Sequence, residues 1–236
     1  MTPGFLAAGG FALAVAVSGI QSGDAIEQYR RVLQADPNDA AARMALKELI
    51  DRAAIPRDQD ERVREILRQH PWHGRATLTL KDEPGLPLIV SGVVRDDHGA
   101  PIAGAVVSVF QTDANGHYTR AAVMDEPHAR LFAFIRTGDD GRFEFTTIRP
   151  GAYPGRPDRQ GERWRIPAHV HFHVTAVGHA VRTFQMVFDD DARMTPYWRA
   201  WAARDQHPIV TIVRRADGAQ RASCDITLRK AASAPW

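Results

Sequence analysis

Apolar and polar residues alternate with two different periods along this chain, and the period changes near residue 75. Within residues 24–75 apolar side chains recur at helical spacing, as at Ile26 and Val32. A "DPND" turn interrupts this pattern, and further helices are predicted at residues 40–55 and 58–70. Because short isolated helices are marginal in water, the apolar faces of this helical arm are expected to pack against another surface.

Residues 76–236 instead contain short segments rich in β-branched and aromatic residues, such as "RFEFTTIR" and "HVHFHVTAV". Turn sequences such as "DDHGAP", "DANGH" and "GDDGR" separate them. In such turns glycine supplies positive φ angles, and Asp or Asn forms side-chain turns. Many short strands with a turn about every 8 to 12 residues are typical of an antiparallel sandwich or barrel. The chain is therefore expected to be mainly β, with an N-terminal helical arm.

Residues 1–23 form a separate apolar segment, whose uncharged run extends from Phe5 to Ile20. This run is short for a transmembrane helix and fits the hydrophobic part of a signal peptide. No Lys or Arg precedes Arg30, whereas signal peptides usually begin with positive charge. We expect a cleaved or anchoring export signal, which makes the protein exported or periplasmic. The alternatives are an apolar helix on a partner subunit and a weak membrane anchor; a protein without the signal is cytoplasmic.

Composition and charge narrow the classes of partner. The 236 residues are 44% hydrophobic, which is typical of a globular protein with a buried core. The formal net charge of +2 is nearly balanced, so there is no electrostatic argument for binding nucleic acid. The single cysteine, Cys224, excludes an internal disulfide.

Three histidines occupy alternate positions in the predicted strand "HVHFHV": His169, His171 and His173. Alternate side chains of a strand point to the same face, so the three imidazoles are expected to stand in a row. One interpretation is a polar, solvated strand face. The other is a metal site, because histidine is the commonest metal ligand and imidazoles two residues apart can converge on one ion.

Two families resemble the β region. "VSGVVRDDHGAPIAGAVVSVF" and "TGDDGRFEFTTIRPGAY" are similar to transthyretin-type sandwiches of the carboxypeptidase regulatory kind, which are mostly structural or binding modules. A longer stretch, about residues 88–190, resembles the intradiol ring-cleavage dioxygenases, which cleave catechol and protocatechuate. The second resemblance implies an enzyme built on an antiparallel β-sandwich. The first leaves a non-catalytic binding module as the alternative.

The dioxygenase resemblance implies one non-haem Fe(III) ion held by two tyrosines and two histidines. "ANGHY" supplies Tyr118, "TIRPGAYP" supplies Tyr153, and "PAHVHF" supplies His169 and His171. The chain has only four tyrosines, so two at the required places are a specific match. The resemblance also implies that Tyr153 and His171 are axial ligands and that substrate displaces Tyr153, which then serves as its base. His173 is outside the family pattern and is expected to line the site rather than to bind metal.

The implied reaction takes a small catechol and O2 as its substrates. Phenolate is a hard, anionic donor, which suits Fe(III) better than Fe(II). Cleavage between the two hydroxyl-bearing carbons of the ring would give a cis,cis-muconate-type product. Related enzymes often associate through N-terminal helices, so a homodimer through the helical arm is expected.

The chain departs from the family pattern just before "PAH" and at Gly155, and it matches the pattern at Gln185. Where the family has an arginine against the substrate ring, just before "PAH", this chain has Ile166, with Arg165 one residue earlier. Arg165 is a catalytic candidate if an extra loop residue returns it to the site. Gly155 replaces a bulkier wall residue, which predicts a wider pocket for an apolar or bulky catechol. Gln185 matches a polar residue near the substrate; its alternative role is a strand residue bonded to backbone.

Two further clusters have structural interpretations. The acidic residues Asp189 to Asp191 in "FDDDAR" predict a solvated turn rather than a calcium site. Trp198 and Trp201 lie at helical spacing in "YWRAWAARD" and are expected to pack against the sandwich or a neighbouring subunit.

Overall fold

The computed structural model describes residues 22–121, 125–157, 163–216 and 218–231. The export signal expected within residues 1–23 therefore lies almost entirely outside the described residues. Among the helices in the described ranges, none is long and apolar enough to cross a membrane.

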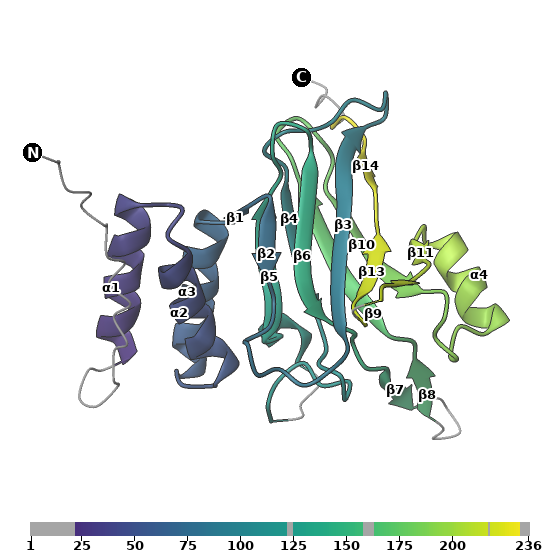
Figure 1. Ribbon diagram of the computed structural model, residues 1–236, viewed down its shortest axis with the longest axis horizontal. Helices are drawn as coiled ribbons and strands as arrows, with labels where there is room; N and C mark the ends of the chain where they lie inside the picture. The colour runs from purple at the N-terminus through teal and green to yellow at the C-terminus, as the bar shows by residue number, and fades with distance from the viewer. Residues whose placement is uncertain (1–21, 122–124, 158–162, 217, 232–236) are drawn as a thin grey trace, which may run out of the picture.

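The β region forms two stacked sheets, with a helix cluster at one end and a single helix at the other (Figure 1). The first sheet has the order β1-β5-β4-β9-β10-β11, with the bounds Trp72–His73, Leu131–Arg136, Val106–Gln111, His169–Thr175, Arg182–Phe188 and Ile209–Val210. The second has the order β12-β13-β3-β6-β2, with the bounds Val213–Arg214, Gln220–Ser223, Pro87–Asp96, Arg142–Ile148 and Arg75–Thr77. The strand β14 (Ile226–Leu228) also pairs with β3, and β7 (Tyr153–Pro157) and β8 (Arg163–Ile166) form a separate hairpin.

The apolar residues that alternate with the histidines in β9 belong to the core of the sandwich. Val170, Phe172 and Val174 are completely buried between the sheets, and the Phe172 ring stacks on Phe184 with 4.8 Å between centroids. Each such side chain contributes roughly 1.5–3 kcal/mol to folding when it is removed from water. Since side chains alternate along a strand, this burial turns the three histidines to the outer face of the first sheet.

The central strand pairs are antiparallel, as predicted, but several edge pairs are parallel. β3 with β6, and β4 with β5 and β9, are antiparallel neighbours. β1 joins β5, β2 joins β6, β11 joins β10, and both β13 and β14 join β3 in parallel. Parallel pairing needs a long connection rather than a tight turn, and these five strands come from segments distant in sequence from their partners.

The helical arm contains α1 (Ser22–Ala35), α2 (Ala40–Asp51) and α3 (Arg57–Gln69). Asp39 caps α2, because its side chain accepts a hydrogen bond from the Ala42 amide at 2.7 Å. α2 ends earlier than the predicted residue 55: Ala53 has a φ of 51°, and Pro56 disfavours helical geometry at the residue before it. The sandwich also begins before residue 76, since Trp72 already pairs with Ile135 of β5.

The apolar faces of the arm are covered by the first sheet of the same chain. Leu46 and Val63 are completely buried in a cluster that includes Phe132 of β5, and Phe134 packs against it. The guanidinium of Arg64 lies over the Phe132 ring, 4.4 Å from its centroid. The apolar faces of the helices, which were expected to pack against another surface, therefore pack against β5 of the same chain. A homodimer through the arm stays a prediction, but these faces no longer require one.

At the other end of the molecule, α4 (Pro196–Arg204) lies against the edge of the first sheet (Figure 1). Trp198 and Trp201 pack against Val187 of β10, which confirms that they contact the sandwich.

Candidate metal centre

Four donor atoms from three separate segments converge on the outer face of the first sheet. The hydroxyl of Tyr118, in the loop after β4, lies 2.8 Å from Nε2 of His171 and 3.2 Å from the hydroxyl of Tyr153. The Tyr153 hydroxyl lies 3.3 Å from Nε2 of His169. The two imidazole Nε2 atoms are 3.0 Å apart. The structure thus brings together all four residues predicted from the sequence as metal ligands.

The group is shielded from solvent. Tyr118 is completely buried, and Tyr153 and His169 are only 5% and 3% exposed. The Phe110 ring stacks on the His171 imidazole, with 4.2 Å between centroids and 7° between planes. Phe110 is the cross-strand partner of His171 in the β4–β9 pair, so strand register fixes this contact.

The hydrogen bonding of His169 selects the tautomer that a metal requires. Its Nδ1 lies 2.7 Å from the carbonyl oxygen of Pro167. A carbonyl can only accept, so Nδ1 carries the proton and the Nε2 lone pair faces the tyrosines. Orientation of a ligating imidazole by a backbone carbonyl is a usual feature of protein metal sites.

Burial disfavours the charged form of each of these four side chains. It raises the pKa of Tyr153 to about 12, and it raises the pKa of Tyr118 still further. It lowers the pKa of His169 to about 4 and that of His171 to about 3. Without a cation the group is therefore neutral at pH 7, and both imidazoles keep a free lone pair. A cation at the centre reverses the preference of the phenols, because it favours their anionic form.

The donor set fits a hard trivalent ion. Within the described ranges, no group of three or more His, Cys, Asp or Glu side chains could hold a metal. Here phenols supply half of the donors, and phenolate oxygen is a known protein ligand of ferric iron. Two phenolates and two neutral imidazoles would leave Fe(III) one net positive charge. Tyr118, Tyr153, His169 and His171 are thus chemically suited to Fe(III).

The Tyr118 loop is held by local turn chemistry. The Asp113 side chain accepts from the amides of Asn115 and His117, at 2.9 and 3.0 Å. Gly116 has a φ of 85°, and a Cβ there would lie 2.7 Å from the carbonyl oxygen of Ala152. Glycine therefore lets this turn approach the backbone next to Tyr153, which brings the two phenols together.

Gln185 lies beside the centre, as predicted. It is the cross-strand partner of His171 in the β9–β10 pair, so both side chains are on the outer face. Its backbone amide donates to Nδ1 of His207 at 2.9 Å.

Arg165 does not join the four donors. In the β7–β8 hairpin Tyr153 is opposite Ile166, so these two share a face and Arg165 points to the other one. The Arg165 guanidinium donates to the carbonyl oxygen of Ala152 at 2.9 Å and lines a polar cavity of about 360 Å³. Ile166 instead packs against the two tyrosines. The return of Arg165 to the centre by a backbone shift is therefore not observed.

Comparison with known proteins shows the family of this chain. A family model described as Dioxygenase matches residues 68–229, well over half of the chain. The chain belongs to the intradiol dioxygenase family. It is 31% identical to catechol 1,2-dioxygenase 2 of Acinetobacter lwoffii and 35% identical to 6-chlorohydroxyquinol 1,2-dioxygenase of Cupriavidus pinatubonensis. Each alignment covers 61% of this chain and 54% of the relative, so the chain spans about half the length of these relatives.

Solved structures of the same family share the fold. Hydroxyquinol 1,2-dioxygenase from Pseudomonas putida DLL-E4 is 26% identical, with a TM-score of 0.54 over 68% of this chain and 62% of that chain. The dioxygenase domain of a dioxygenase carbohydrate-binding protein fusion from Streptomyces sp. SirexAA-E is 28% identical. Its TM-score is 0.51, and the match covers 67% of this chain and 90% of that domain.

Within this intradiol dioxygenase fold, one cavity is lined by Ile166, which packs against the cluster that contains Tyr118 and Tyr153. It has a volume of about 300 Å³ and is lined by Gly155, Trp164, Ile166, Tyr197 and Trp198. The lining is apolar and aromatic, and the Trp164 and Tyr197 rings lie 5.5 Å apart. A Cβ at Gly155 would lie 3.4 Å from Cγ1 of Ile166, so the Ile166 side chain occupies part of the space next to this glycine. A wider pocket at Gly155 stays a prediction.

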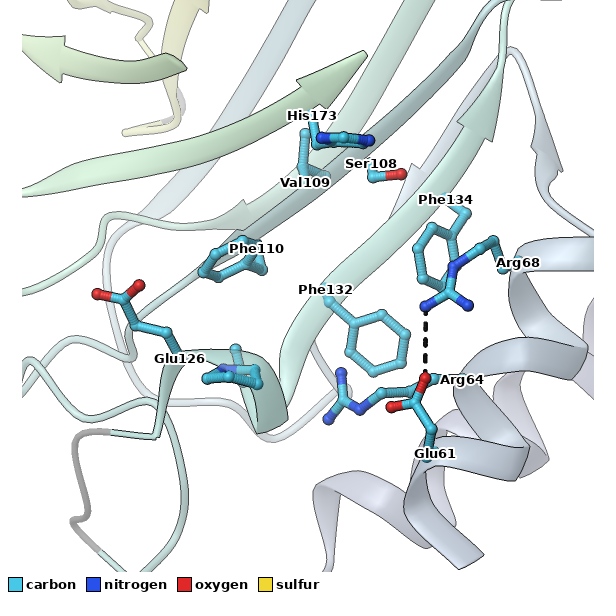
Figure 2. Close-up of a pocket in the computed structure, with 12 residues that line it drawn as sticks. Glu61, Arg64, Arg68, Ser108, Val109, Phe110, Glu126, Phe132, Phe134 and His173 are labelled. Atoms are coloured by element: carbon cyan, nitrogen blue, oxygen red, sulfur yellow. Dashed lines mark ion pairs between the residues drawn. The ribbon is translucent and has the colours of Figure 1, made fainter. Parts of the chain in front are cut away.

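A second cavity, of about 410 Å³, lies on the other side of the centre, between α3 and the outer face of the first sheet. Figure 2 shows Phe110 and His173 on the sheet side and Arg64 and Arg68 on the helix side. His173 is exposed there, and its Nδ1 lies 3.0 Å from the hydroxyl of Thr183. It lines a cavity next to the donors, as expected, and makes no contact with them.

Sequence reasoning missed two residues that support the centre. Asp191 was interpreted as part of a solvated turn, yet one of its carboxylate oxygens accepts from the Ala168 amide at 2.8 Å, next to His169. Its neighbours Asp189 and Asp190 do form surface ion pairs. His207 contacts the Gln185 amide and packs on Trp201 with 4.2 Å between centroids. Neither has a local sequence signal, because each contacts a residue more than 20 positions away in the chain.

Proposed function

We propose that this chain is a non-haem Fe(III) dioxygenase that cleaves a catechol-type ring between its two hydroxyl-bearing carbons. O2 is the second substrate, and the product is a cis,cis-muconate-type dicarboxylic acid. The observation that carries the proposal is the convergence of two phenols and two imidazoles within 2.8–3.3 Å of one another. A non-catalytic binding module has no need of this buried set.

Tyr118, Tyr153, His169 and His171 would hold the ion. When bound, it would take a catechol through both oxygens and make the ring reactive toward O2. The completely buried Tyr118 keeps its place. Tyr153 begins an edge hairpin, and Ile166, directly opposite it in that hairpin, lines the 300 Å³ cavity. In the proposed role the Tyr153 phenolate leaves its position as substrate enters and accepts a proton from a substrate hydroxyl.

Gln185 is proposed to orient the substrate, because it lies on the same face as His171. Arg165 has no part in the proposal, since its guanidinium donates to the Ala152 carbonyl and lines another cavity. Ile166 and Trp198 would provide an apolar wall on the ring-binding side.

The same wall supports a substrate preference. A carboxylate entering the apolar cavity without a partner would cost several kcal/mol in desolvation. Ile166 offers no such partner, whereas aromatic surface from Trp164 and Trp198 is available. Alkyl-, aryl- or halogen-substituted catechols are therefore proposed as better substrates than protocatechuate.

Oxygen uptake by the ferric-loaded protein tests the function directly. A panel of catechol, 4-methylcatechol, 4-chlorocatechol and protocatechuate would be compared, with mass spectrometry of the products. The expected product contains both atoms of O2 and has an opened ring. Iron binding without turnover of any catechol would contradict the proposed reaction, and a clear preference for protocatechuate would contradict the proposed substrate class.

A further inference from the structure

A cluster of six charged side chains, all but Arg120 largely buried, connects the helical arm to the loop that carries Tyr118. Three cations and three carboxylates take part: Lys47, Arg120, Arg130, Asp51, Glu83 and Asp113. Arg130 is its centre. Its guanidinium donates to Asp51 at 2.9 Å, to Asp113 at 3.2 Å, and to both carboxylate oxygens of Glu83 at 2.5 Å. Asp51 is completely buried, and the Arg130 side chain is 6% exposed.

The cluster contacts the Tyr118 loop at three points. The Arg130 amide donates to the Tyr118 carbonyl oxygen at 2.9 Å. Asp113, which binds the Arg130 guanidinium with one carboxylate oxygen, uses the other to hold the turn that precedes Tyr118. On the other side, Nε of Arg120 donates to the Asp51 carbonyl oxygen at 2.6 Å. Tyr118 therefore lies between two loop residues that are connected to α2 through Asp51.

The arm contributes a second cation to the same place. Lys47, one turn before Asp51 on α2, donates from Nζ to the Arg130 carbonyl oxygen at 2.9 Å, and it is 2% exposed. The backbone of Arg130 is thus held at its carbonyl by the arm, while its amide holds Tyr118.

Stability alone is a poor explanation for this cluster. Burying charges carries a desolvation penalty that the attraction between them often fails to offset, and apolar replacements are frequently as stable. Two atoms of the cluster, Oδ2 of Asp51 and Nε of Arg130, are buried without a hydrogen-bond partner in the described part of the chain. What the charges supply, and apolar side chains cannot, is a set of directional contacts that define the position of the loop.

We propose that Asp51 and Arg130 are positioning residues for Tyr118, so that the helical arm forms part of the apparatus that holds this metal ligand. The inference rests on the proposed function in one respect, that Tyr118 binds the ion. Removal of the Asp51 charge should weaken the hydrogen bond from Arg130, because a neutral amide oxygen is a weaker acceptor than a carboxylate, and should allow the Tyr118 turn to open more often.

The test compares Asp51→Asn with Asp60→Asn. Asp60 pairs with Arg64 within α3, its side chain is 14% exposed, and it has no contact with the Tyr118 loop among the described residues. Amide hydrogen exchange of the iron-free proteins reports on the loop at residues 115, 117 and 130. Ferric affinity and the position of the tyrosinate charge-transfer band report on the ligand. For Asp51→Asn we expect faster exchange at these amides, a shifted band, and ferric affinity about 10- to 100-fold lower, the range for groups that orient metal ligands. Asp60→Asn should change none of the three.

Equal exchange, affinity and spectrum in the two variants would overturn the proposal. If Asp51→Asn fails to fold, Arg120→Gln provides the same comparison, because it removes contacts to Asp51 from a side chain that is 44% exposed. An Arg120→Gln protein with unchanged exchange and affinity would then count against the proposal. Amide exchange and ferric affinity need no catechol turnover, so failure of the proposed reaction would remain distinguishable from failure of this inference.

Discussion

The Tyr118 hydroxyl lies 2.8 Å from Nε2 of His171, although 53 positions separate these residues in the chain. Two local structures produce the contact. The β4–β9 pair places His171 beside Phe110, and the Asp113 turn after β4 carries Tyr118 back over the same face. A phenol and an imidazole are thereby presented to the same point.

Ferric loading should give a coloured protein, because tyrosinate-to-Fe(III) charge transfer absorbs visible light. Tyr118→Phe removes one donor, and His169→Ala removes another; both should lose bound iron and the absorption band. His173→Ala is the matched control from the same strand face, and it should keep both. Visible spectroscopy with iron analysis measures the outcome. A wild-type protein that stays colourless after ferric loading would contradict the iron assignment.

The iron-free protein should lose stability as the pH falls from about 6.5 toward 4. His169 and His171 are neutral in the folded protein, with pKa values near 4 and 3, whereas the unfolded chain protonates them below about 6.5. The unfolded state therefore binds more protons in this range, and each imidazole contributes up to about 1.4 kcal/mol of lost stability per pH unit. Urea unfolding at a series of pH values measures the slope.

The slope can be assigned with variants that cannot titrate. His169→Gln and His171→Gln should each flatten the dependence of unfolding free energy on pH in the acidic range. His173→Gln, at the exposed end of the row, should leave it as in the wild type. An unchanged slope in the double variant of His169 and His171 would show that other groups cause the acid sensitivity.

Ile166→Arg should shift substrate preference toward carboxylated catechols. The new cation would lie on the face of Tyr153 and offer a partner to a carboxylate, which Ile166 cannot. We expect the kcat/KM ratio of protocatechuate to 4-methylcatechol to rise by about tenfold, equivalent to ~1.4 kcal/mol. Arg165→Gln should leave this ratio unchanged. A large fall in the ratio with Arg165→Gln would mean that Arg165 reaches the substrate after all.

Leu46→Ala should destabilise the protein by about 2–5 kcal/mol, the usual range for a buried leucine. Leu46 is completely buried where the arm meets β5, so the change leaves a cavity between them. Arg31→Ala, on an exposed part of the arm, should change the unfolding free energy by no more than about 0.5 kcal/mol. Chemical denaturation measures both. Similar values for the two variants would indicate that the arm is only loosely attached.

The sequence by itself determined the type of most elements and the four side chains that converge on the outer face of the first sheet. Helical and strand periods are local properties, so the arm, the β region and the alternation of His169 and His171 with buried residues follow from the order of residues. The two tyrosines were found through short motifs that survive in the linear chain. The covering of the arm by Phe132 had no such signal, because the contact joins segments far apart in sequence.

Only the tertiary structure decided which side chains face the centre. Ile166 and Arg165 are adjacent in sequence, and the register of the β7–β8 hairpin places Ile166 beside Tyr153 and turns Arg165 away. A shift of one residue in a strand exchanges its two faces, so register carries information that composition and spacing lack. The Asp51–Arg130 contact likewise joins residues 79 positions apart. Such contacts arise when packed elements meet, and no local pattern of residues specifies them.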